Sequence, residues 1–175
     1  MKRVITTTLA LSLAFVVSCQ RAGRPERADR NSPPARLTTD QIDESINAGL
    51  KRKPDDREAG IALKKALKAL DPASSEPIHK AVYWFKVAKA HGQTLTGEEE
   101  KQFVDASRKL TKQVQEKYST ACDLEADKKY ADAIQRFREL MHMLPILGGG
   151  NEKDELRASI MAHLAHNTAL SKKSK

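Results

Sequence analysis

Five histidines and two cysteines are the side chains of this sequence with the strongest metal-binding chemistry. His163 and His166 stand three residues apart in a stretch of helical periodicity, so both rings can lie on one helix face. A metal site usually needs a third ligand, and the sequence has neither an H-E-x-x-H nor a C-x-x-C motif to supply one. The other histidines, His79, His91 and His142, are isolated. We therefore predict no metal ion and no cofactor, and we interpret the histidines as packing or surface residues.

Motifs for phosphate binding and for acid–base or nucleophilic catalysis are also missing. The run Gly148-Gly149-Gly150 is followed by acidic residues and lacks the Lys-Ser/Thr pair of a phosphate-binding loop. The run Glu98-Glu99-Glu100 begins a predicted helix, where negative charge complements the helix dipole, so it needs no catalytic explanation. No serine lies in a nucleophile-elbow motif. We predict that the chain is not an enzyme; a hydrolase with an unrecognised site is the alternative.

The N-terminus has the pattern of an export signal. Lys2 and Arg3 are followed by an uncharged stretch over residues 4–17. This stretch has the length of the apolar region of a signal peptide and is too short for a stable membrane span. We predict that residues 1–18 are a signal peptide.

The segment Val16-Val17-Ser18-Cys19 resembles the lipobox of bacterial lipoproteins. The resemblance implies lipid attachment at the Cys19 thiol, cleavage after Ser18 and acylation of the new amino group. Gln20 stands where the family's inner-membrane retention signal has aspartate, which implies an outer-membrane position facing the periplasm if the source has such a membrane. The alternatives are a plain secretory signal with a chance cysteine and an uncleaved anchor.

The second cysteine, Cys122, has no partner within the chain if Cys19 is acylated, which excludes a disulfide framework. An unpaired thiol in an oxidising compartment is most often buried, and we predict this for Cys122. The alternatives are an intermolecular disulfide and a reactive thiol.

Residues 19–37 are predicted to be the lipidated cysteine followed by a disordered tether. The stretch 20–37 is rich in arginine and proline and has too few apolar residues to offset the entropy of ordering. Five arginines against two acids give it a charge of 5 − 2 = +3. A solvated spacer is the interpretation we favour, because the acids interrupt the arginines; contact with an anionic membrane is the alternative.

Residues 38–175 are predicted to form an all-α domain of about six helices in antiparallel hairpins. Aromatic residues make up 5% of the chain, so the core must rest on Leu, Ile, Val and Ala. Capping boxes at Thr38 and Thr96 mark two helix starts. The expected helices run from Thr38 towards Pro54, from Asp55 to Leu70, from residues 75–77 to Gly92, from Thr96 to about Lys128, from Tyr130 to Pro145, and from Asn151 to a solvated tail at residues 171–175.

Residues 121–145 resemble one tetratricopeptide repeat (TPR). The resemblance rests on the spacing of Ala121, Leu124, Tyr130, Ala133, Phe137, Leu140 and Pro145. It implies two helices that approach closely through small residues, in a unit that ends at the proline. The aromatic that the family has early in its first helix is absent. A bundle of helical hairpins without true repeats is the alternative.

Three consecutive aromatic residues, Tyr83, Trp84 and Phe85, lie on the third expected helix. Successive residues turn by about 100° around a helix axis, so they cannot all face the core. We expect Tyr83 or Trp84 to approach the surface, where it is a candidate contact for a partner. The alternative is that the ring covers a neighbouring helix.

Composition and motifs together favour a membrane-anchored, non-enzymatic adaptor in the cell envelope, whose partners are membrane lipid and an envelope protein. The formal net charge is +8, and removal of Lys2 and Arg3 with the signal leaves 8 − 2 = +6. A basic lipoprotein that binds an anionic envelope polymer or lipid surface is the alternative. Export argues against nucleic acid as the partner.

Overall fold

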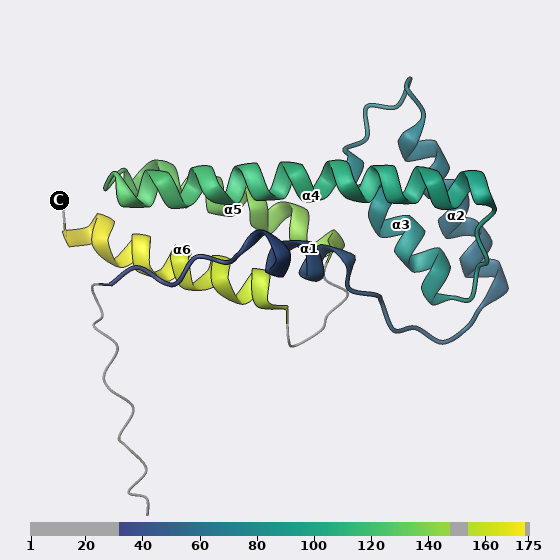
Figure 1. Ribbon diagram of the computed structural model, residues 1–175, viewed down its shortest axis with the longest axis horizontal. Coiled ribbons are helices and arrows are strands. Elements are labelled where there is room, and N and C mark those ends of the chain that lie inside the picture. The colour runs from purple at the N-terminus through teal and green to yellow at the C-terminus, as the bar shows by residue number, and fades with distance from the viewer. Residues whose placement is uncertain (1–31, 148–153, 174–175) are drawn as a thin grey trace, which may run out of the picture. The chain divides into compact units, whose positions relative to one another are not determined.

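The computed structural model describes residues 32–147 and 154–173, which belong to one compact unit that begins at Asn31. These residues form six α-helices and no strand, which confirms the all-α prediction (Figure 1). Consecutive helices α2 and α3, α4 and α5, and α5 and α6 pack against one another. None of the helices among the described residues combines the length and apolar character needed to cross a membrane. The helices are α1 (Thr39–Asn47), α2 (Asp56–Leu70), α3 (Ile78–Ala90), α4 (Gly97–Ala126), α5 (Tyr130–Leu147) and α6 (Glu155–Lys173).

The predicted start signals hold at three helices. Thr38 and Thr96 each accept a hydrogen bond from the backbone N–H three residues on, and the Gln or Glu at that position accepts one from the backbone of the cap. Asp55 caps α2 through the backbone N–H of Glu58. These caps satisfy amide groups that a helix start otherwise leaves without partners.

Two helix ends differ from the expectation. Helix α1 stops at Asn47 instead of continuing towards Pro54, because Ala48 leaves the helical region of backbone space. Helix α5 continues through Pro145 and ends at Leu147, so the proline does not stop it. Proline lacks only its own N–H, and its ring penalises the preceding turn, so two further residues can still follow it in helical geometry.

The last helix also differs from its predicted bounds. It begins at Glu155, after Asp154 accepts a hydrogen bond from the backbone N–H of Arg157. Asn151, the predicted cap, lies outside the described residues. At the other end the helix continues to Lys173, so residues 171–173 are helical and do not form a separate solvated tail.

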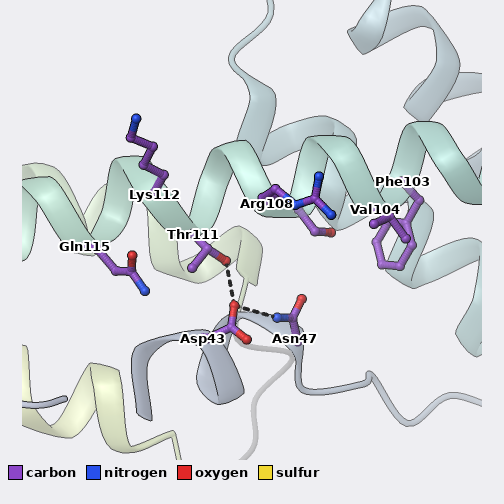
Figure 2. Close-up of a pocket in the computed structure, with 9 residues that line it drawn as sticks. Asp43, Asn47, Phe103, Val104, Arg108, Thr111, Lys112 and Gln115 are labelled. Atoms are coloured by element: carbon purple, nitrogen blue, oxygen red, sulfur yellow. Dashed lines mark hydrogen bonds between the residues drawn. The ribbon is translucent and has the colours of Figure 1, made fainter. Parts of the chain in front are cut away.

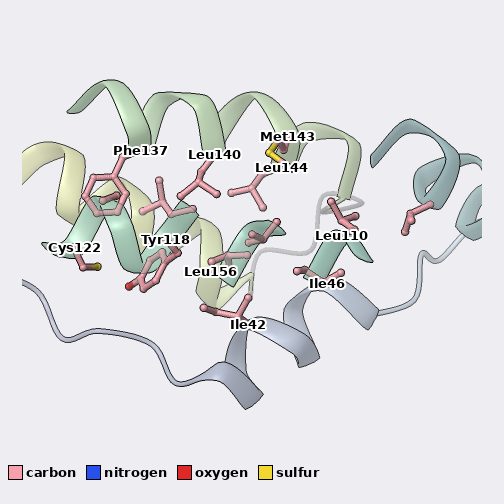
Figure 3. Close-up of a cluster of buried hydrophobic side chains, with 14 of the residues drawn as sticks. Ile42, Ile46, Leu110, Tyr118, Cys122, Phe137, Leu140, Met143, Leu144 and Leu156 are labelled. Carbon is pink, nitrogen blue, oxygen red and sulfur yellow. The ribbon is translucent and has the colours of Figure 1, made fainter. Parts of the chain in front are cut away.

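The main core lies between α1, α4, α5 and α6 (Figure 3). Large side chains dominate it, and Leu110, Phe137, Leu140, Leu156 and Ile160 are fully buried. The residues come from positions three and four apart on each helix, the spacing that places side chains on one helix face. Burial of side chains of this size gives this part of the molecule most of its hydrophobic stabilisation.

The α2–α3 hairpin has a core of small residues. Helix α2 buries only alanines, namely Ala59, Ala62, Ala66 and Ala69, so the two helices can approach closely. Helix α3 contributes Val87 and Ala88 to this contact and turns Phe85 towards Phe103 of α4. Six of the 13 residues of α3 are buried, so this helix buries a wide face.

Residues 33–37, which we assigned to the tether, contact the helices. The Arg36 guanidinium lies 2.9 Å from the Asp123 carboxylate, and the Leu37 backbone N–H donates to the Tyr118 hydroxyl at 3.2 Å. The Leu37 side chain packs against the main core. The predicted spacer therefore ends before this segment; its residues 20–31, like Cys19 and the signal, lie outside the described residues.

Candidate functional site

Tyr83 and Trp84, the predicted contact residues, are both half-buried on α3, whereas Phe85 is fully buried. Their rings meet edge to face, with centroids 5.0 Å apart. The Lys65 ammonium lies 4.2 Å from the centroid of the Trp84 ring, and the Arg52 guanidinium donates to the Tyr83 hydroxyl at 3.3 Å. Each ring therefore contacts a side chain of a neighbouring segment and remains partly exposed to solvent.

These two rings form one side of a groove of about 420 Å³ between α2 and α3. Lysines dominate the rest of its lining, which consists of Lys65, Lys68, Lys80 and Glu76. Lys80 and Glu76 lie 3.8 Å apart, one helical turn from each other, so two of the three lysines have no acid beside them in the groove. We call this surface the lysine–tryptophan groove. Aromatic faces beside unneutralised ammonium groups suit an acidic segment that also carries an apolar side chain.

A second, larger pocket of about 600 Å³ lies between α1 and α4 (Figure 2). Its apolar part consists of Phe103 and Val104, and Val104 is 43% exposed. At its polar side the Asp43 carboxylate accepts hydrogen bonds from Thr111 at 3.2 Å and Asn47 at 2.9 Å. The bond from Thr111 joins α4 to α1, whereas the bond from Asn47 lies within α1. The Asp43 carboxylate is therefore engaged in holding the two helices together.

A buried polar cluster between α4 and α6 is the site that the sequence analysis missed. Glu125 Oε2 accepts hydrogen bonds from His163 Nδ1 at 2.8 Å and from Asn167 Nδ2 at 2.7 Å. The Tyr118 hydroxyl lies 3.2 Å from His163 Nε2 and 2.7 Å from the Ser159 hydroxyl. Glu125, His163 and Asn167 are at most 6% exposed. We call these five residues the glutamate–histidine cluster.

One set of proton positions satisfies every bond that Tyr118 and His163 make. His163 donates from Nδ1 to the Glu125 carboxylate, which leaves Nε2 to accept the Tyr118 proton. The Tyr118 oxygen then accepts from Ser159 and from the Leu37 backbone N–H. The cluster thus joins α4, α6 and the segment before α1 through directional bonds in a low-dielectric interior.

The two histidines that the sequence placed on one helix face do lie near the same carboxylate. His163 is bonded to Glu125 Oε2, and His166 Nε2 lies 3.7 Å from Oε1. Within residues 32–147 and 154–173, no group of three or more His, Cys, Asp or Glu side chains is arranged to hold a metal ion. The spacing of the two histidines was visible in the sequence. The role of Glu125 could not be predicted, because it is one of many acids on α4 and its burial depends on α6.

Cys122 is buried beside this cluster, as predicted, and it is unpaired among the described residues. Burial raises the pKa of its thiol to about 11, although the nearby Arg36 acts in the opposite direction. The thiolate is the reactive form of cysteine, and this pKa keeps the group protonated at neutral pH. Cys122 therefore behaves as a small apolar core residue.

Lys86 is a second buried charge that the sequence did not reveal. It lies on α3 among apolar residues, and its ammonium donates to the backbone carbonyls of Ile46 and Ala48, at 2.9 Å in the latter case. Burial lowers the pKa of Lys86 to about 8. These carbonyls belong to the C-terminal end of α1, where a cation complements the helix dipole, so Lys86 ties the α2–α3 hairpin to α1.

Five residues of the tetratricopeptide-like pattern belong to the main core between α4 and α5, namely Ala121, Leu124, Ala133, Phe137 and Leu140. Ala121, Ala133, Phe137 and Leu140 are fully buried, and Leu124 and Tyr130 are half-buried. Phe137 stacks on the His163 ring of α6, with centroids 4.9 Å apart. Helix α4, at 30 residues, is nearly as long as a whole 34-residue repeat. No known protein family, curated protein or solved structure matches the chain, so membership of the repeat family stays a prediction.

Proposed function

We propose that the chain is a bacterial lipoprotein, anchored through acylated Cys19, whose helical body is a non-enzymatic adaptor for another protein of the cell envelope. If the source has an outer membrane, the body faces the periplasm. The lipobox resemblance supports the anchor, and two or more acyl chains give stable attachment where a single chain does not. The resemblance to a tetratricopeptide repeat supports the adaptor role, because repeats of that family bind proteins along their surface.

The observation that carries the adaptor proposal is the lysine–tryptophan groove. Trp84 is half-buried and remains partly exposed to solvent. Tryptophan is among the residues that contribute most binding energy at protein interfaces. Lys65 and Lys68 add positive charge on the opposite helix. The partner that fits is an acidic segment with an apolar side chain that packs on the Trp84 ring.

Crosslinking in the native cells tests the adaptor proposal. Wild type, Trp84→Ala and the control Met161→Ala, which changes an exposed apolar residue on α6, are crosslinked and purified. We expect one envelope protein in constant ratio with wild type and with the control, and its loss with Trp84→Ala. Recovery of that protein at full yield with Trp84→Ala would show that the groove is not the contact.

The alternative function is binding of an anionic envelope polymer or lipid surface. Lys65 and Lys68 favour it, because ammonium groups with no acid beside them in the groove attract any polyanion. It predicts recovery of wall fragments or lipid without a specific protein, and binding that falls steeply as salt rises. Protein binding centred on Trp84 should persist at salt concentrations that screen exposed lysines.

The anchor has its own test. Cells that express wild type or Cys19→Ser are given a labelled fatty acid, and the protein is isolated. We expect label in wild type alone, because only a thiol can form the thioether. Label in the Cys19→Ser protein would contradict the anchor assignment.

A further inference from the structure

A pocket of about 300 Å³ lies beside the glutamate–histidine cluster, where the end of α4 meets α6 and the segment before α1. This volume is at the lower end of those that hold small-molecule ligands. Several of its lining side chains are apolar or aromatic, namely Pro33, Pro34, Cys122, Tyr130 and Leu170. Such walls can cover the hydrocarbon part of a small ligand.

The inner end of this pocket holds a carboxylate that is only half satisfied. Glu125 lines the pocket, and its Oε2 takes both of the hydrogen bonds that the carboxylate accepts. Its Oε1 is buried and accepts no hydrogen bond from the described residues; His166 Nε2, whose residue also lines the pocket, lies 3.7 Å away. A buried carboxylate oxygen without a donor is costly, so this atom suits a group that brings N–H donors and positive charge.

Two exposed residues that line the pocket, Lys128 and Arg36, carry positive charge. Lys128 lines the pocket, is exposed, and makes no ion pair with the described residues. Its backbone adopts φ 61° just after α4, a conformation that helix ends favour. Arg36 also lines the pocket, but Asp123 already neutralises it at 2.9 Å. The pocket therefore presents the Glu125 carboxylate, with His163 and His166 beside it, and one exposed, uncompensated cation.

We propose that this pocket binds a small zwitterion of the amino-acid class. The ligand's ammonium donates to Glu125 Oε1, its carboxylate pairs with the Lys128 ammonium, and its side chain contacts the apolar walls. A simple amine would meet the positive charge of Lys128, and a simple acid would meet Glu125. The zwitterion is the ligand class that complements both ends. This site does not depend on the adaptor proposal, since it shares no residue with the lysine–tryptophan groove.

Titration calorimetry on the full-length chain in detergent tests the ligand class. Each standard amino acid is titrated separately at millimolar concentration, and the best ligand is compared with its decarboxylated amine and its deaminated acid. We expect the amine and the acid to bind at least about tenfold more weakly, because each loses one charge-assisted contact. Equal binding of the amine or the acid would overturn the zwitterion assignment, and no binding by any amino acid would overturn the site.

Three variants test the residues. Glu125→Gln should weaken binding about tenfold or more, because it removes the buried charge. Lys128→Met should weaken it about two- to fivefold, as expected for an exposed ion pair. The matched control is Lys129→Met, an adjacent exposed lysine that pairs with Asp127 and does not line the pocket; it should bind as wild type does.

Circular dichroism shows whether Glu125→Gln still folds. If it does not, Lys128→Met and Lys129→Met still decide the matter, because both residues are exposed and their replacement leaves the core intact. Unchanged affinity in a folded Glu125→Gln, or equal affinity of the two lysine variants, would contradict the proposal.

Discussion

The α4–α6 end of the molecule and the α2–α3 hairpin bury different kinds of side chain. The first packs large residues such as Phe137 and Ile160 around a buried Glu125 and His163. The second packs mainly alanines and lines a surface groove with lysines and with the half-buried rings of Tyr83 and Trp84. Because apolar area and satisfied polar bonds both hold helices in place, we expect the α4–α6 end to be the more stable part and the hairpin to be the more adaptable one.

This difference suggests a division of roles. A groove between helices that meet through small side chains can adjust to a macromolecular partner, whereas a pocket beside a directional hydrogen-bond cluster has a fixed shape that suits a small ligand. The adaptor surface and the proposed zwitterion pocket each lie in the region whose packing fits them.

The largest effect should come from the stacked aromatic of the α4–α6 core. Phe137→Ala should lower the free energy of unfolding by about 3 to 5 kcal/mol, because it leaves a cavity and removes the ring that covers His163. Leu63→Ala, at a half-buried position of the hairpin, should cost less. Urea denaturation measures both, and an equal loss would remove the contrast between the two regions.

The next effect concerns the buried hydrogen bond between Glu125 and His163. His163→Leu should cost about 3 kcal/mol or more, since Glu125 is then left with Asn167 alone as donor. The double variant Glu125→Leu/His163→Leu should regain part of that loss, because no buried charge then lacks a partner. A double variant less stable than the single one would show that the cluster contributes net stability beyond the cost of burying its charges.

Lys86 connects the two regions and should give a pH-dependent effect. Lys86→Met should cost about 1 to 3 kcal/mol by leaving the Ile46 and Ala48 carbonyls without their donor. The pKa of Lys86 is about 8 in the fold against an ordinary 10.5, so between these values the unfolded chain binds a proton that the native state lacks. The stability of wild type relative to Lys86→Met should therefore rise from pH 8 to pH 10.5. Chemical denaturation at several pH values measures this difference, and a constant difference would contradict the assigned cause.

The smallest effect should come from the hairpin surface. Lys65→Met removes the ammonium that lies over Trp84 and should cost about 0.5 to 1 kcal/mol, the value of an exposed cation–π contact. Thermal unfolding followed by tryptophan fluorescence measures it at the one tryptophan of the chain. A loss above 2 kcal/mol would mean that this contact is part of the core.

The order of the helices could be predicted from the sequence, because the residues that indicate a helix act locally. Capping residues such as Thr38 and Thr96 and the spacing of apolar residues act within one or two turns, so they fix where helices start and which face is buried. Helix ends were less well predicted: Ala48 ends α1 without a strong local stop, and Pro145 does not end α5.

The candidate sites could be predicted from the sequence only in part. Three adjacent aromatics implied that one of Tyr83 and Trp84 would reach the surface, because a single helix cannot turn three neighbours inward. The lysines around them come from a different helix, so the groove and its charge needed the tertiary contact between α2 and α3.

The sequence by itself determined an all-α chain and the faces that its helices bury, because helix periodicity and apolar spacing are properties of neighbouring residues. It also predicted the burial of Cys122, because an unpaired thiol in an oxidising compartment is most often buried. The tertiary structure alone decided that Glu125, Lys86 and His163 are buried while many similar residues stay in water. The physical reason is that the burial of a polar group depends on which distant segment covers it and supplies its hydrogen bonds. For Glu125 those donors come from residues about 40 positions later in the chain.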